Sequence, residues 1–324
     1  MQGSTLELPA GYYLERDPDV LILRRLDGSM VGAFSARGAA PEAVLGTIEE
    51  ATPRAPRSAL RARFFGHFEM FCNDEPVTLG RNGKALAILK YLLAHRVRPV
   101  SQDYLMGWLW PESNLKKARW SLNSAIHVLR KLLSDCPSSG ARNYVLLEEG
   151  YYRLCPTVRV ETDVDEFDAH YDRGRCLERT HRRQEAAAEY ERAVELYRGD
   201  YMIEDFYEDW TMVERERLAN AYVDMLWRLA VHYMEAGQPQ ESIRFCYKLL
   251  EKDRCHEDSY RLLMRCYASL GLRGRALRHY RLCEEVLEQE YGTTPSAETR
   301  SLYSSLLGYE SALGRPGSSD SPPP

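Results

Sequence analysis

A 34-residue period in the C-terminal half constrains the fold more than any other feature of this 324-residue chain. Three pairs of identical or similar residues lie one period apart: Tyr233 and Tyr267, Gly237 and Gly271, and Ile243 and Leu277. From Val164 onward the apolar residues follow a helical pattern, and a period of this length is typical of repeated pairs of helices. The second half is therefore predicted to be a stack of helix pairs.

Thirty-four residues is the period of tetratricopeptide repeats, so an all-α domain of that type is predicted over residues 160–310. An earlier helix pair, at about 164–198, falls out of step with the period because a long helical insertion around 207–236 intervenes. The tail, 311–324, is rich in Gly, Ser and Pro and is expected to be disordered.

The first 58 residues resemble a separate small ββα segment of unknown role. Val20–Leu23 and Met30–Phe34 are predicted strands, and Asp27-Gly28 between them is a hairpin turn signal. A short helix is expected from Pro41 to Ala51.

Residues 61–155 follow the order of a winged helix, which would give an α+β winged helix-turn-helix domain before the helical repeats. The predicted elements are two strands within 62–79, helices at 82–95, 101–108 and 114–134, and a β-hairpin at 143–155. In such a domain the third helix lies in the DNA major groove and the hairpin is the wing.

The predicted third helix is amphipathic. Its apolar stripe consists of Leu122, Ile126, Leu129 and Leu133. The opposite face carries Lys117, Trp120, Ser124, His127 and Lys131. A helix with a merely solvated basic face would show the same periodicity, but the order of the surrounding elements favours DNA binding.

The charge distribution supports a single DNA-contacting segment. The whole chain has a net charge of −5. Residues 61–155 nevertheless hold 14 Lys and Arg against 8 Asp and Glu, a net of +6, whereas residues 1–60 have −2 and residues 156–324 have −9. A local basic segment is the expected footprint of phosphate contacts.

The predicted DNA contacts combine cations for phosphates with short polar or apolar groups for base edges. They are Arg81, Lys116, Lys117, Arg119, Trp120, Ser121, Ser124, His127, Val128, Arg130, Lys131, Arg142 and Asn143.

Other chemistries have little support in the sequence. The Gly83-Lys84 pair lacks the spacing and the following Ser or Thr of a phosphate-binding loop. No cofactor, metal ligand set or catalytic residue is predicted, so the chain is not expected to be an enzyme. The N-terminus has no signal-peptide pattern and no apolar stretch is long enough to span a membrane, so a cytoplasmic location is expected, with eight free cysteines.

Short motifs over residues 62–307 resemble the antibiotic-regulatory-protein type of bacterial transcriptional activators. In the first domain they are Leu109-Trp110-Pro111, Ala118-Arg119, Leu129-Arg130-Lys131 and Gly150-Tyr151-Tyr152-Arg153-Leu154. In the second they include Ala193-Val194-Glu195-Leu196-Tyr197-Arg198-Gly199, Trp210, Glu214-Arg215-Glu216-Arg217-Leu218 and Tyr291-Gly292. In that family a winged helix precedes a "bacterial transcriptional activator domain".

The resemblance implies sequence-specific binding to double-stranded promoter DNA, a homodimer and recruitment of RNA polymerase subunits. The sequence departs from the family on the outward face of the third helix, where several arginines are replaced by Trp120, Asn123, Ser124, His127 and Val128. It departs again at the hairpin tip, which holds Glu148 and Glu149. These departures leave three alternatives open. The DNA site is read with fewer charges and more apolar contact, or the chain binds DNA weakly until a partner helps. In the third alternative the chain is a tetratricopeptide-type protein-interaction scaffold whose winged helix does not bind DNA.

An acidic run with aromatic neighbours, at residues 201–210, has two interpretations. We expect its aromatic residues to pack in the core behind a solvated helix start. The other interpretation is a contact surface for a polymerase subunit or a second protomer.

Overall fold

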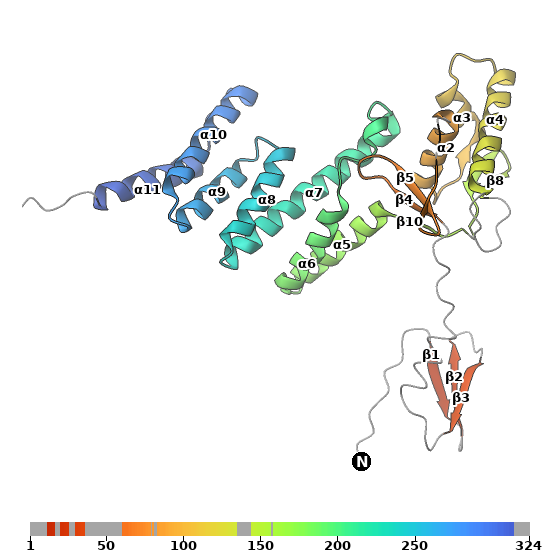
Figure 1. Ribbon diagram of the computed structural model, residues 1–324, viewed down its shortest axis with the longest axis horizontal. Coiled ribbons are helices and arrows are strands. Elements are labelled where there is room, and N and C mark those ends of the chain that lie inside the picture. Colours follow the sequence, from red (N-terminus) through yellow and green to blue (C-terminus); the bar gives the residue numbers. More distant parts are fainter. Residues whose placement is uncertain are drawn as a thin grey trace, which may run out of the picture. The chain divides into compact units, whose positions relative to one another are not determined.

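The computed structural model describes residues 12–16, 20–25, 30–35, 60–78, 80, 83–134, 144–156 and 158–313. The chain divides into two compact units: residues 1–61 with 70–160, and residues 62–69 with 161–324. The first unit mixes strands and helices, and the second is mostly helical (Figure 1).

The N-terminal part contains a three-stranded antiparallel sheet of order β1-β2-β3, formed by Tyr12–Arg16, Val20–Arg25 and Met30–Ser35. The two predicted strands are present. The sequence did not indicate β1, which pairs Leu14 with the buried Leu23. The helix predicted at 41–51 lies outside the described residues.

Three helices and three short strands follow in the first unit. They are α2 (Gly83–Ala94), β7 (Val100–Ser101), α3 (Gln102–Leu109), α4 (Leu115–Ser134), β8 (Val145–Glu148) and β9 (Tyr151–Leu154). The helices agree with those predicted to within two residues. Ser101 caps α3, because its Oγ accepts a hydrogen bond from the Tyr104 N–H at 3.1 Å.

The predicted hairpin is formed by β8 and β9, and β7 adds to it to give a sheet of order β7-β9-β8. The connecting residues Glu149 and Gly150 both have positive φ, at 49° and 83°, which suits a tight two-residue hairpin turn. The Gln102 N–H donates to the Gly150 carbonyl at 2.9 Å, which connects the start of α3 to this turn.

A second sheet has the order β10-β4-β5-β6. Its strands are Leu60–Arg63 (β4), Glu69–Cys72 (β5), Glu75–Pro76 (β6) and Val160–Thr162 (β10). Asn73 and Asp74 form the predicted turn between β5 and β6, both with positive φ. Residues 62–69 belong to the second unit, with its helices.

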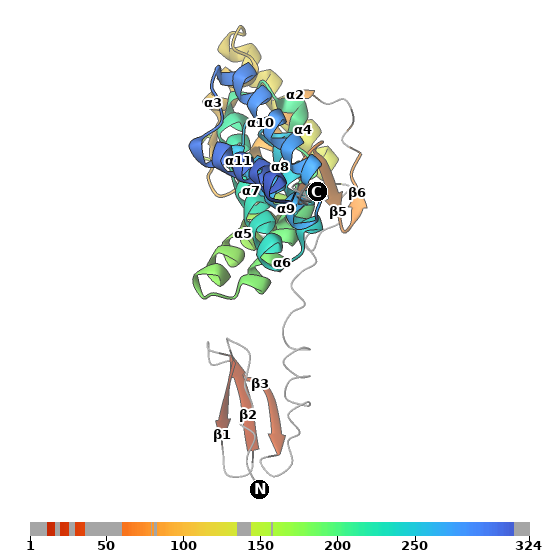
Figure 2. The same cartoon turned by 90° about the vertical axis from the view of Figure 1, so that its left-hand side faces the viewer.

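The second unit is a succession of helices that follow one another in chain order (Figure 1). They are α5 (Asp163–Arg179), α6 (Arg183–Leu196), the short 3-10 helix η1 (Ile203–Asp205), α7 (Asp209–Glu235), α8 (Pro239–Lys252), α9 (Glu257–Ser269), α10 (Arg273–Tyr291) and α11 (Ala297–Leu313). Figure 2 shows the same unit after a 90° turn, with several of these helices overlapping in the view. The predicted helical repeat is confirmed, including the long insertion, which is the 27-residue helix α7.

The helix pairs share one turn geometry. Gly237 and Gly271 have φ of 71° and 72°, and each lies at the turn from the first to the second helix of a pair. In the earlier pair, α5 and α6, the equivalent residue is His181, with φ of 59°. All three turns contain the same backbone hydrogen bond, in which an N–H group just after the helix donates to the carbonyl five residues earlier. The bonds run from Arg182 N–H to Leu177 O, from Gln238 N–H to Tyr233 O and from Leu272 N–H to Tyr267 O. The out-of-step pair is therefore a repeat of the same kind.

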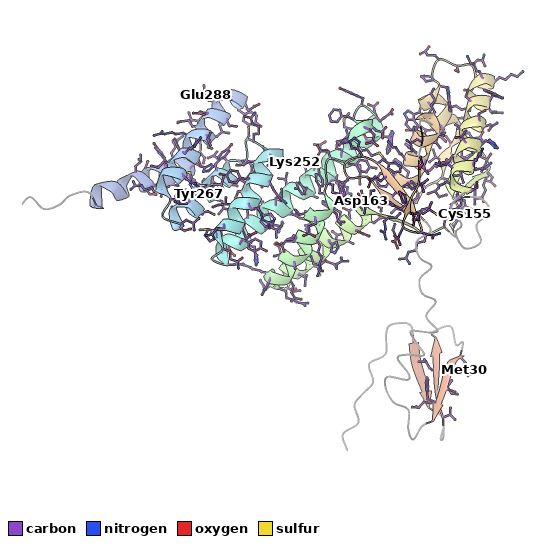
Figure 3. All side chains as sticks on the ribbon, in the orientation of Figure 1. Met30, Cys155, Asp163, Lys252, Tyr267 and Glu288 are labelled. Atoms are coloured by element: carbon purple, nitrogen blue, oxygen red, sulfur yellow. The ribbon has the colours of Figure 1, made fainter. Side chains whose placement is uncertain are left out.

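Residues 62–69 are fixed to the helices by Asp163, at the start of α5 (Figure 3). Its two carboxylate oxygens accept hydrogen bonds from the backbone N–H groups of Phe64 and Phe65, at 2.8 and 3.1 Å. Burial raises the pKa of Asp163, and these two hydrogen bonds counteract the rise. The ring of Phe65 packs against those of Phe167 and Tyr197.

Candidate nucleic-acid interface

Helix α4 is held against the first unit by one face and exposes the other. The predicted apolar stripe, Leu122, Ile126, Leu129 and Leu133, is fully buried. Asn114 begins the helix, because its side-chain oxygen accepts from the Lys117 N–H at 2.9 Å. The core contacts on one side leave the opposite face available to a partner.

That exposed face carries the residues predicted to contact DNA. The exposed ones are Lys116, Lys117, Arg119, Trp120, Ser124, His127, Arg130 and Lys131. Ser121 and Val128 are half-buried. The three remaining predicted contacts, Arg81, Arg142 and Asn143, lie outside the described residues. The pattern of one basic, polar face on α4 is therefore as predicted, while the contacts to DNA stay a prediction.

Trp120 is the most unusual member of this face. It is 72% exposed although it is the largest apolar side chain of the helix. A helical wheel at about 100° per residue places it opposite the buried Leu129, in the centre of the exposed arc. Asn123 is exposed beside it and was missing from the predicted contacts, although its place on the same arc could have revealed it.

Arg130 has a role that the sequence did not indicate. Its Nη2 and Nε donate to the Val145 carbonyl at 2.9 and 3.2 Å, so the guanidinium joins α4 to the first strand of the hairpin. Burial raises the pKa of Tyr152, and the charge of this guanidinium offsets part of the rise. Arg130 fixes the position of the hairpin relative to α4.

The hairpin tip is acidic, as expected. Glu149 lies in the turn, and Glu148 forms an ion pair with Arg153 at 2.7 Å. Lys84, from the Gly-Lys pair at the start of α2, donates to the Leu109 carbonyl and lies over the ring of Trp110 at 4.6 Å. Its amine therefore connects α2 to the end of α3.

Comparison with known proteins adds the family. Residues 162–307 match the family model described as "Bacterial transcriptional activator domain". This segment therefore resembles a bacterial transcriptional activator domain, and we call residues 162–307 the activator domain. The resemblance to activators of the antibiotic-regulatory-protein type is confirmed.

The relatives are regulators of transcription. The chain is similar to the "Transcriptional regulatory protein MoaR1" of Mycobacterium bovis, at 24% identity, and of Mycobacterium tuberculosis, at 25%. Each match covers 77% of this chain and 79% of the relative. Among solved structures, it resembles Mycobacterium tuberculosis EmbR in complex with a low-affinity phosphopeptide, at 24% identity and a TM-score of 0.64. That match covers 78% of this chain but only 65% of the EmbR chain, and it establishes the fold.

The activator domain exposes an apolar surface on residues 201–213, which we call the aromatic loop. The expectation that its aromatic residues lie in the core is right for Tyr201, which is buried, and wrong for Phe206 and Tyr207. Tyr207 is 95% exposed and packs edge-on against Phe206, with ring centroids 5.5 Å apart. Ile203, Met212 and Val213 are exposed on the same segment.

Arg215 holds this loop in one conformation. It donates to the backbone carbonyls of Tyr201 at 2.9 Å, of Phe206 at 3.1 Å and of Asp205 at 3.2 Å. It also bonds the Thr211 Oγ1 at 2.7 Å and lies over the Phe206 ring. A single guanidinium therefore preorganises an exposed aromatic surface, which reduces the entropy that a partner must overcome on binding.

The activator domain also has two adjoining cavities of about 470 and 500 Å³. Trp227, Val231 and Glu235 of α7 line both. Charged side chains of α7 itself, such as Arg228, and of α9, such as Arg261, complete the walls.

None of the described helices is long and apolar enough to cross a membrane. In the described part of the chain, no three His, Cys, Asp or Glu side chains come together as metal ligands.

Proposed function

We propose that the chain is a cytoplasmic, sequence-specific DNA-binding transcription regulator that activates transcription. In this proposal α2, α3, α4 and the β8–β9 hairpin form a winged helix-turn-helix unit. Helix α4 enters the major groove of promoter DNA and the hairpin is the wing. The activator domain dimerises and contacts RNA polymerase, without a cofactor and without catalysis.

The observation that carries the proposal is the outward face of α4. This face gathers exposed lysines and Arg119 around neutral polar groups on one rigid helix, in the unit where the chain is basic. Phosphate contacts from such cations position a protein on DNA, while groups between them read bases. The relatives named as transcriptional regulatory proteins support the same conclusion. Arg81, Arg142 and Asn143 remain in the proposed set of contacts.

The test is a titration of the full chain against its own upstream DNA and a scrambled duplex at two salt concentrations. We expect tighter binding to the upstream DNA, and a slope that reports about 0.9 per phosphate neutralised. The variant Lys117→Glu with Lys131→Glu should lose binding and keep its helical circular dichroism spectrum.

The matched control is Arg278→Glu with Arg281→Glu, which changes the net charge equally on exposed positions of α10. This control should bind DNA like the wild type. Retained promoter binding by the α4 variant, or equal loss in both variants, would contradict the proposal.

A second candidate function rests on the two adjoining cavities of the activator domain. In this alternative the repeats are a scaffold that binds a peptide along α7, and the first unit does not bind DNA. The acidic hairpin tip favours it, because Glu149 repels phosphate. Absence of DNA binding at the lower salt concentration, with a protein partner whose binding is lost in Trp227→Ala, would establish this alternative.

A further inference from the structure

The exposed face of α4 carries its cations at the two ends and none in the middle. Lys116, Lys117 and Arg119 lie in the first turns and Lys131 in the last. The face between them, from Trp120 to His127, contains aromatic, amide, hydroxyl and imidazole groups. Arg130 does not interrupt this pattern, because its guanidinium is bonded to the hairpin carbonyl.

This spacing matches a helix lying in a major groove. At 1.5 Å per residue, Lys117 and Lys131 are separated by about 21 Å along the helix axis. A major groove is about 12 Å wide, so flexible lysines at both ends reach the phosphates on its two walls. The middle of the helix then lies over the base edges, away from phosphate.

The chemistry of the middle selects among bases. The commonest specific contact to guanine is a bidentate Arg or Lys at O6 and N7, and the middle of this face offers neither. An Asn side chain matches adenine at N6 and N7, and apolar groups match the C5 methyl group of thymine. Asn123 and Trp120 are exposed and lie within one turn of each other, so both can meet successive base pairs.

Trp120 is the strongest part of this argument, since its large apolar ring is 72% exposed in the centre of an otherwise polar face. Leaving an indole in water forgoes the favourable free energy of burial, which a groove lined by methyl groups would recover. The outward face of α4, charged at its ends and neutral in its centre, is thus suited to contact base edges that carry methyl groups.

We propose, resting on the function proposed above, that the centre of each DNA half-site is A·T, with Trp120 packed on thymine C5 methyl groups and Asn123 paired with adenine. A protein partner seated on Trp120 is the competing interpretation, and it would leave the base composition of the site unconstrained.

The test starts with selection of binding sites from a randomised duplex library by the full chain. Each thymine in the centre of the selected site is then replaced by deoxyuridine, which removes the methyl group and keeps every hydrogen-bonding group. For the wild type we expect affinity to fall about fourfold per methyl group, the value that burial of one such group gives. For Trp120→Ala the thymine and deoxyuridine duplexes should bind equally.

The matched control is Leu115→Ala, which truncates another exposed apolar residue of α4 that lies about 140° from Trp120 around the helix. It should keep the fourfold preference for thymine. A selected site with a G·C centre would overturn the inference, and so would equal binding of thymine and deoxyuridine duplexes by the wild type, although either result would leave DNA binding itself established. No enriched sequence at all would overturn the proposed function and this inference together.

Discussion

Substitution of Gly174 by alanine is expected to destabilise the activator domain, although the same change usually stabilises a helix. Gly174 lies in α5, facing α6. A Cβ placed there would press against Cε1 of Tyr190 and would lie 2.7 Å from its Cδ1 and 2.9 Å from its Cζ. Carbon atoms in contact are about 3.5–4.0 Å apart, so the ring would have to move by about 1 Å.

Tyr190 has little freedom to make that movement. Its side chain is almost completely buried, and its ring packs near that of Tyr171, with centroids 6.3 Å apart. Overpacking of this kind costs about 1–3 kcal/mol, whereas Ala in place of Gly in a helix gains about 1 kcal/mol. The net expectation is a loss of up to about 2 kcal/mol in the free energy of unfolding.

The measurement is urea unfolding followed by circular dichroism at 222 nm, with Gly308→Ala as the control. Gly308 lies in the middle of α11 and no described atom comes within 4 Å of its added Cβ, so this variant should gain about 0.5–1 kcal/mol. The two identical changes should therefore have opposite signs. A Gly174→Ala variant that gains as much stability as Gly308→Ala would refute the assigned packing of α5 against α6.

Three further changes probe other elements of the activator domain. His181→Gly should stabilise it by about 1 kcal/mol in thermal unfolding, because a non-glycine residue at φ of 59° carries a steric cost that glycine lacks; a loss of stability would contradict the turn geometry. Burial lowers the pKa of His279, and the charge of Arg278 lowers it further, so the unfolded chain takes up a proton first as the pH falls below about 6.5. The free energy of unfolding should therefore fall toward acidic pH, by at most about 1.4 kcal/mol per pH unit from this group. In unfolding curves measured from pH 7.5 to 5, His279→Phe should make this decline less steep. An unchanged dependence of stability on pH would exclude His279 as the cause. Arg215→Lys should lower the free energy of unfolding by about 2 kcal/mol, since an amine cannot replace the several hydrogen bonds that the guanidinium donates to the aromatic loop. Protease cleavage near residue 206 should also become faster in this variant. An unaltered cleavage rate would show that other contacts order the loop.

The periodic elements could be predicted from sequence because periodicity is a local signal. Helix α4 was predicted to within one residue, since Leu122, Ile126, Leu129 and Leu133 repeat at helical spacing and are all buried. The strand β7 was missed because two residues, Val100 and Ser101, cannot show any alternation. Its pairing with β9 arises from the tertiary fold.

The relation of the first helix pair to the later repeats was obscured by the long helix α7, which puts the pair out of step, and by the residue type at one turn. Self-comparison depended on Gly237 and Gly271, whereas the corresponding turn of α5 and α6 contains His181 in the same left-handed conformation. A substitution that keeps the backbone conformation but changes the residue type removes the sequence signal and leaves the turn intact, at a steric cost.

Some features of the candidate site follow from local sequence and could be predicted, whereas others arise only from the tertiary fold. Which residues share the outward face of α4 follows from helical spacing alone, so Lys117, Trp120 and Lys131 could be placed together in advance. The use of Arg130 could not, because its partner is the Val145 carbonyl, fifteen residues away and brought close only when the hairpin folds onto α4. Phe206 and Tyr207 show the converse error, since aromatic residues are usually buried and only the fold reveals an exposed pair.

The separation of charge within the chain bears on which surface meets which kind of partner. Residues 156–324 have a net charge of −9, which repels a phosphate backbone, whereas the exposed face of α4 belongs to the basic segment. The aromatic loop lies in the acidic part, so its exposed Phe206 and Tyr207 suit a protein surface better than a nucleic acid. The contacts of Arg215 to the loop, and the acidic residues Glu208 and Asp209 within it, favour a partner whose apolar patch is bordered by lysine or arginine. On physical grounds, then, DNA affinity should depend on α4, and any protein contact made through the aromatic loop should be separable from it by mutation.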